Sequence, residues 1–275
     1  MLNRINYFLK FYFEATTLYN VHSPYVYRLV HFLFHNKLTP ALTKELNSIR
    51  QFWLNCPDVI ENKDLGAGSS MNANRAHIAV KDIAATAMSG SSKLLLLHNL
   101  AQYFTPKLCV ELGTSLGMSA ACLATHSDKV VTIEGNPQIA SLAQRTFAMI
   151  QQSNVETLVG NFDNLLPEIL KKDKPDLIYV DGNHTYEATI SYFQMILEHP
   201  MHNDLVVIFD DIYWSDGMYK AWIEIQTHKR ISLTINVYHF GIAFFNQDII
   251  SPRHYTLVPS KWKPWHIGFA PVKSH

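Results

Sequence analysis

Acidic residues and a histidine stand at the ends of short apolar runs in the second half of the chain. Asp181 ends one run and His184 follows three residues later, while Asp210 and Asp211 come at the end of the next run. Three carboxylates on neighbouring strand ends suit a hard cation such as Mg²⁺, which prefers oxygen ligands. A histidine titrates near neutral pH and can therefore act as a general base without large tuning. The simpler alternative stays open, namely that these side chains are caps and turn residues.

A glycine-containing turn follows the first apolar run. Residues 111–117 read ELGTSLG, and a glycine at such a turn lets the backbone approach a ligand closely while the next helix presents free N–H groups. The second run ends at Glu134, 23 positions after Glu111. An acid near that spacing can accept hydrogen bonds from both hydroxyls of a ribose. The two features together predict a site for a nucleoside cofactor.

The spacing of the glycines indicates which kind of nucleoside cofactor to expect. A dinucleotide fingerprint reads G-x-G-x-x-G, and its second glycine makes room for the pyrophosphate. Here three residues separate Gly113 from Gly117, so a pyrophosphate is disfavoured. A second glycine segment at Asp64–Ser69 has no strand before it, and we expect a structural or substrate-side loop there.

The elements that must position these residues alternate along the chain from residue 108 onward. The apolar runs are Leu108–Leu112, Val130–Glu134, Val155–Val159, Leu177–Asp181 and Leu205–Asp210. Helical stretches are expected near 116–125, 137–152, 165–171, 186–198 and 217–228. This alternation predicts parallel strands covered on both faces, and Ile231–Tyr238 with Gly241–Phe245 predicts a terminal hairpin. We therefore expect a doubly wound, Rossmann-like α/β sheet of five parallel strands plus a C-terminal antiparallel hairpin, with ligands beyond the carboxyl ends of the strands.

The first part of the chain reads as helices and turns. Residues 1–88 are expected to form an N-terminal helical cap on a catalytic domain at residues 89–275. Thr39 before Pro40 predicts a helix start, and a further helix is expected over Ser91–Tyr103. The aromatic N-terminus predicts a helix that docks on the protein, with a helix lying on a membrane surface as the alternative.

At these motifs the chain resembles the class I S-adenosylmethionine-dependent methyltransferases, over about residues 89–245. The similar segments are ELGTSLGMS, VVTIEGNP, VGNF, LIYVDGNHTYEA and VVIFDDIYWS. The nearest likeness is to small-molecule O-methyltransferases with a D-G-x-H-x-Y-E motif after the fourth strand. The resemblance implies that S-adenosylmethionine is the cofactor. It also implies the residues that contact this cofactor or shape its pocket, which are Glu111, Gly113, Ser115, Gly117, Glu134, Asn161 and Asp181.

The resemblance also implies a reaction, namely methyl transfer to a hydroxyl of a small molecule. Cation-dependent members hold a metal with an Asp after strand four and an Asp-Asn pair after strand five. The matching positions are Asp181, Asp210 and Asp211, so an Asp replaces the Asn and Mg²⁺ is expected there. His184 stands near the place of the family's lysine base, which makes His184 and Asp181 the expected catalytic residues.

Two alternative functions remain, and the role of three aromatic side chains is undecided. The rivals are a non-catalytic partner subunit that binds the same cofactor, and a nicotinamide-dependent oxidoreductase. Tyr213, Trp214 and Trp222 follow the fifth strand, where aromatic side chains either wall an acceptor pocket or fill the core.

Composition excludes some partners. The 275 residues include 23 Lys plus Arg and 23 Asp plus Glu, for a formal net charge of zero, which argues against binding nucleic acid or an anionic membrane by bulk charge. Three cysteines without CxxC spacing predict no disulfide framework and a reducing, cytoplasmic location. No apolar run is long enough to span a membrane. We expect a small-molecule acceptor as the partner, and monomer and homodimer both remain open.

Overall fold

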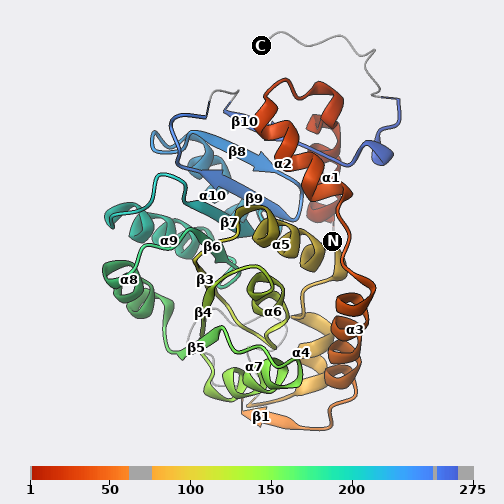
Figure 1. Cartoon of the computed structure of the whole chain (residues 1–275), viewed down its shortest axis with the longest axis vertical. Coiled ribbons are helices and arrows are strands. Elements are labelled where there is room, and N and C mark those ends of the chain that lie inside the picture. Colours follow the sequence, from red (N-terminus) through yellow and green to blue (C-terminus); the bar gives the residue numbers. More distant parts are fainter. Residues whose placement is uncertain (1, 62–75, 250–252, 266–275) are drawn as a thin grey trace.

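The computed structural model describes residues 2–61, 76–249 and 253–265. Its centre is an eight-stranded sheet with the strand order β10-β8-β9-β7-β6-β3-β4-β5, shown in Figure 1. The strands of this sheet are β3 (Leu108–Leu112), β4 (Lys129–Glu134), β5 (Val155–Val159), β6 (Leu177–Val180), β7 (Val206–Asp210), β8 (Leu233–Asn236), β9 (Phe240–Phe244) and β10 (His254–Thr256). The Asp64–Ser69 segment lies outside the described residues.

The predicted doubly wound sheet is confirmed. Strands β5, β4, β3, β6 and β7 run parallel, and β9 pairs antiparallel with both β7 and β8. The expected hairpin is therefore β8–β9. Strand β10, which pairs parallel with β8, was not expected from the sequence. It spans only His254–Thr256, which is too short for an alternating pattern to show.

Helices cover both faces of the sheet. Helix α5 (Ser91–Phe104) precedes β3 in the chain. The helices that follow β3 are α6 (Met118–Ala124), α7 (Pro137–Met149), α8 (Phe162–Lys172), α9 (Tyr186–Glu198) and α10 (Asp216–Thr227). Side chains of α5, α6 and α7 pack on one face, and those of α8, α9 and α10 pack on the other. Along β3, Cys109 joins the first cluster and Val110 the second, because successive side chains point to opposite faces. The interior strands therefore carry apolar side chains on both faces, although β3 and β4 also contain the buried polar residues Glu111 and Thr132.

Short polar side chains begin several of these helices. Asn136 accepts a hydrogen bond from the backbone N–H of Gln138 at the start of α7, and Thr185 accepts one from Ala188 at the start of α9. Such caps satisfy N–H groups that have no partner within the helix. They place helix starts at the carboxyl edge of the sheet, directly after β4 and β6.

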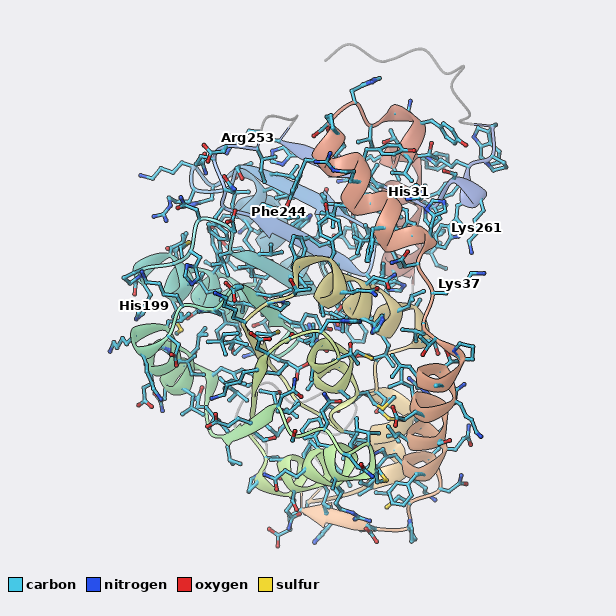
Figure 2. The ribbon with its side chains drawn as sticks, in the orientation of Figure 1. His31, Lys37, His199, Phe244, Arg253 and Lys261 are labelled. Carbon is cyan, nitrogen blue, oxygen red and sulfur yellow. The ribbon has the colours of Figure 1, made fainter. Side chains whose placement is uncertain are left out.

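The N-terminal segment runs along one side of the molecule in Figure 1. It contains α1 (Leu2–Glu14), α2 (Pro24–His35), α3 (Pro40–Leu54), β1 (Val59–Glu61), β2 (His77–Ala79) and α4 (Val80–Thr86). Phe244 of β9, labelled in Figure 2, packs against Tyr25 of α2 and Phe104 of α5. The expected cap helices thus share a core with the sheet.

Helix α1 is held in place by the C-terminal segment. The backbone N–H of Thr16 donates to the carbonyl of Thr256 at 2.8 Å, and Lys263 Nζ donates to the carbonyl of Ala15 at 2.6 Å. Phe11 of α1 is almost fully buried. The predicted docking helix therefore packs on the protein itself, and no helix in the described part of the chain is both long and apolar enough to cross a bilayer.

Candidate active site

The turn after β3 is built by close contact between backbone segments. Gly113 has φ +104°, and a Cβ added there would lie 2.3 Å from the carbonyl oxygen of Asp181. Only glycine fits such a conformation and approach without strain. The backbone N–H of Asp181 also donates to the carbonyl of Leu112 at 2.9 Å. The turn after β3 and the end of β6 therefore form one edge, which brings the glycine motif beside Asp181.

The end of β4 contacts the same turn. Glu134 Oε2 accepts a hydrogen bond from the backbone N–H of Ser115, and its Oε1 accepts one from Asn136, both at 3.0 Å. These two bonds hold the Glu134 carboxylate against the turn that follows β3. Glu134 is partly exposed at this edge, as its expected ribose-binding role requires.

Glu111 lies fully buried beneath the turn. Its Oε2 accepts a hydrogen bond from Thr132 Oγ1 of β4 at 2.5 Å. Burial raises the pKa of Glu111 to about 7. Within the described residues, Glu111 Oε1 and the Ser115 hydroxyl are buried without a hydrogen-bond partner. Buried polar atoms are rarely left unpaired, so two of them beside one turn indicate a place for a polar ligand group.

Asn161 lies at the end of β5, where the expectation placed it, and caps α8. Its Oδ1 accepts a hydrogen bond from the backbone N–H of Asp163 at 2.9 Å. The side chain is exposed. The capping hydrogen bond alone explains why an asparagine stands at this position. The contact of Asn161 with a cofactor stays a prediction.

Tyr179 links the acids at the ends of β6 and β7. Its hydroxyl lies 3.0 Å from Asp181 Oδ2 and 2.9 Å from Asp210 Oδ2. Burial and the adjacent Asp210 raise the pKa of Asp181 well above its usual range. Burial opposes ionisation of Asp210 as well, but Lys93 and Asp181 hold the pKa of Asp210 below its usual value. Asp210 therefore ionises more readily than Asp181.

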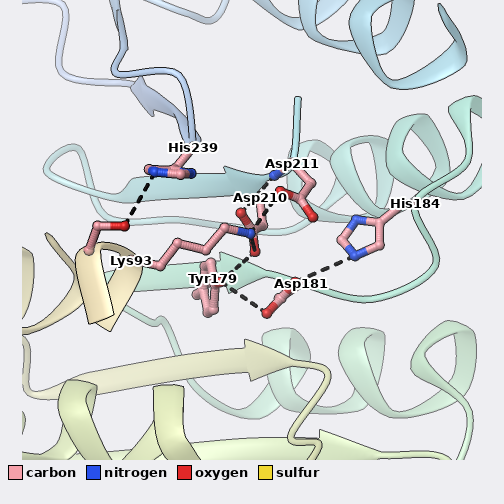
Figure 3. A network of polar contacts seen from close by, with 8 residues as sticks. Lys93, Tyr179, Asp181, His184, Asp210, Asp211 and His239 are labelled. Carbon is pink, nitrogen blue, oxygen red and sulfur yellow. Dashed lines mark hydrogen bonds and ion pairs between the residues drawn. The ribbon is translucent and has the colours of Figure 1, made fainter. Parts of the chain in front are cut away.

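Lys93, from the first turn of α5, reaches between the two acids that follow β7. Its Nζ lies 2.7 Å from Asp210 Oδ2 and 2.7 Å from Asp211 Oδ1, as Figure 3 shows. Although burial opposes the charged form, these carboxylates raise the pKa of Lys93 above its usual value. An ammonium group thus lies between the carboxylates that were expected to bind a metal.

The predicted Mg²⁺ site is not supported by this geometry. Among the residues that the structure describes, no three His, Cys, Asp or Glu side chains gather in a way that could hold a metal ion. Asp210 and Asp211 both direct an oxygen at Lys93 Nζ, and Asp181 faces Tyr179 and His184 instead. A divalent cation at this place would lie against a positive charge, so the donor set does not fit one.

His184 lies beside these acids, and its side chain is 28% exposed. Its Nε2 is 3.5 Å from Asp181 Oδ1, and its ring centroid is 6.2 Å from that of Trp214. Trp214 is 47% exposed and carries Arg4 of α1 over its ring. Tyr213 and Trp222, by contrast, are buried in the core. Of the three aromatic candidates, only Trp214 is therefore exposed enough to contact a bound molecule.

Sequence reasoning missed Lys93 and Tyr179. Lys93 is the third residue of α5, where the helix dipole disfavours a positive charge, and this mismatch is the signal that could have singled it out. Tyr179 stands two residues before Asp181 and so points to the same face of β6. A tyrosine inside an otherwise apolar strand was the corresponding hint.

The comparison with protein families covers the strands of this site. Residues 110–212 match the model of a family described as a methyltransferase domain. A search of curated proteins found no match. The matched segment extends from β3 to the end of β7 and includes every expected site residue. The resemblance to methyltransferases is thus supported for this part of the chain, and the narrower D-G-x-H-x-Y-E branch stays a prediction.

Solved structures share the fold. A methyltransferase from Podospora anserina with S-adenosylhomocysteine bound has a TM-score of 0.56 and 16% identity, covering 79% of this chain and 94% of that one. An O-methyltransferase from Bacillus cereus in complex with S-adenosylhomocysteine has a TM-score of 0.52 and 18% identity, and the match covers 77% of this chain and 93% of that one. The O-methyltransferase TomG from Streptomyces achromogenes, in complex with S-adenosylmethionine, has a TM-score of 0.50 and 19% identity, and the match covers 76% of this chain and 91% of that one. At these identities the likeness shows a common fold.

Proposed function

We propose that this protein is an S-adenosylmethionine-dependent methyltransferase that acts on a hydroxyl group of a small molecule. The observation that carries the proposal is the single edge shared by the β3 turn, Glu134 and the group around His184. This edge lies inside the segment that matches a methyltransferase domain. The proposed cofactor site at the β3 turn and the proposed proton acceptor near His184 are therefore neighbours, and a group-transfer reaction requires its reactants to be held close together.

The residues at the β3 turn fit the proposed cofactor. Glu134 presents a carboxylate at the carboxyl edge of the sheet, where the ribose hydroxyls would bind, and Glu111 Oε1, which has no hydrogen-bond partner among the described residues, can accept a hydrogen bond from a donor group such as an ammonium. The backbone N–H groups that start α6 lie next to them. The presence of these three kinds of polar group at one turn supports this cofactor over a pyrophosphate-bearing one.

His184 is the proposed general base. When bound, S-adenosylmethionine supplies a methyl group on a sulfonium, and its S–C bond breaks as the acceptor oxygen forms the new C–O bond. The oxygen needs a free lone pair, so its proton must leave. Because His184 Nε2 faces Asp181, we propose that Nδ1 is the ring nitrogen that takes up the proton leaving the acceptor oxygen. Trp214 and the first turn of α1 then lie on the acceptor side.

Thermal unfolding with added ligand tests the cofactor. S-Adenosylhomocysteine should stabilise the protein, because a ligand that binds only the native state shifts unfolding by about 2.7 kcal/mol at 100 times its Kd. NADH at the same concentration serves as the control and should leave the midpoint unchanged. Stabilisation by NADH instead would favour an oxidoreductase. Binding of S-adenosylhomocysteine without turnover on a panel of small phenols and alcohols would favour the non-catalytic partner subunit.

Glu134→Ala should weaken binding of S-adenosylhomocysteine by roughly 1.5–3 kcal/mol, the range for hydrogen bonds that involve a charged group. Isothermal titration calorimetry measures the change. Glu156→Ala is the matched control, because Glu156 lies on the neighbouring strand β5 in an exposed ion pair with Lys129. Unchanged affinity in a folded Glu134→Ala variant would remove Glu134 from the cofactor site.

A further inference from the structure

The ammonium of Lys93 is a cation that the chain itself supplies at the end of β7. Its Nζ contacts one carboxylate oxygen of Asp210 and one of Asp211, each at 2.7 Å. The Lys93 side chain is only 15% exposed, and Asp210 is 1% exposed. Buried charges of this kind persist only when paired, so Lys93 and Asp210 depend on each other.

The position of Lys93 in the fold shows that this contact is built by tertiary structure. The residue comes from α5, which precedes the first strand of the parallel sheet, and it is separated from Asp210 by 117 positions. Figure 3 shows the lysine entering from the side of α5, with His184 on the opposite side of the acids. The ammonium contacts Asp210 and Asp211, whereas the proposed base contacts Asp181, so the two groups reach this cluster of acids from two directions.

We infer that Lys93 is the resident cation of this site and takes the place that a divalent metal would need. The ammonium has three N–H donors, of which Asp210 and Asp211 accept two. The third donates to the acceptor oxygen and stabilises the negative charge that grows there as the proton passes to His184. The role in the reaction rests on the proposed methyl transfer, whereas the exclusion of a divalent cation rests on the ion pairs alone.

Mn²⁺ alone is the probe for the exclusion of a divalent cation, because no acceptor is needed. Wild-type protein should show no saturable Mn²⁺ binding by calorimetry. Lys93→Met, which keeps the volume and removes the charge, should gain saturable Mn²⁺ binding, since two carboxylates suffice for a hard cation that keeps some of its waters. Adding Asp210→Asn to Lys93→Met should abolish the gain. Lys129→Met, which breaks an exposed ion pair with Glu156 at 2.6 Å, is the control and should gain nothing.

Turnover gives the second measurement. Lys93→Met should lose roughly 10²–10³-fold in kcat, as when a preorganised donor to a developing oxyanion is removed. Lys93→Arg, which keeps the charge, should retain more activity than Lys93→Met. Wild-type turnover should be the same in EDTA and in Mg²⁺.

Two results would overturn the inference. One is Mn²⁺ binding to the wild type that Asp210→Asn removes, a measurement that decides the matter even if Lys93→Met fails to fold. The other is a folded Lys93→Met variant that neither binds Mn²⁺ nor loses activity. Failure of the proposed function can be distinguished from failure of this inference. If the protein binds no S-adenosylhomocysteine, the Mn²⁺ titrations still test whether Lys93 excludes a divalent cation.

Discussion

Replacing His184 by Gln is expected to lower the rate of methyl transfer by roughly 10²–10⁴-fold, the usual contribution of a general base. Glutamine keeps hydrogen-bonding capacity toward Asp181 but cannot take up the acceptor's proton. The affinity for S-adenosylhomocysteine should barely change, because His184 acts on the acceptor side. The measurements are steady-state turnover and calorimetry of the same preparation.

The pH dependence distinguishes a base from a structural histidine. Wild-type turnover should fall toward acidic pH, because a protonated imidazole cannot accept another proton. The variant should lack this acidic limb. His202→Gln is the matched control, since His202 also faces an aspartate, with Nε2 at 4.0 Å from Asp176 Oδ1, and that aspartate directly precedes β6, at the opposite edge of the sheet. A His184→Gln enzyme with normal turnover and its acidic limb intact would place the base elsewhere.

Gly113→Ala is expected to destabilise the protein by about 3 kcal/mol or more, since a non-glycine residue at a sparsely populated positive φ costs of order 1–3 kcal/mol. The added Cβ would also meet the Asp181 carbonyl oxygen at 2.3 Å, and this oxygen is backbone that cannot rotate away. In a chain of this size the unfolding midpoint should fall by roughly 6–12 °C. Affinity for S-adenosylhomocysteine should fall as well, because the turn carries Ser115.

Gly90→Ala provides the comparison for this substitution. A Cβ at Gly90 would meet nothing within 4 Å, and the backbone there has φ −66°, which any residue adopts. Its midpoint should stay close to that of the wild type. Circular dichroism on heating measures both variants, and a Gly113→Ala midpoint equal to that of Gly90→Ala would mean that the turn tolerates a side chain.

The parallel strands and the glycine turn could be predicted from the sequence because their signals are local. The five apolar runs coincide with β3 to β7 to within one residue at each end. Gly113 and Glu134 were recognised because a strand-to-helix turn and the next strand end lie at a nearly fixed separation in such folds. Strand β10 gave no signal over its three residues.

Which charges meet at the end of β7 was decided only by the tertiary structure. Asp181, Asp210 and Asp211 could be placed at one edge because parallel strands end together, and a metal between them was a reasonable expectation. The path of α5 across that edge depends on how its apolar side chains pack on the sheet, which no local pattern specifies. That packing brings Lys93 to within 2.7 Å of two carboxylates more than a hundred residues away, so the site holds an ammonium between them.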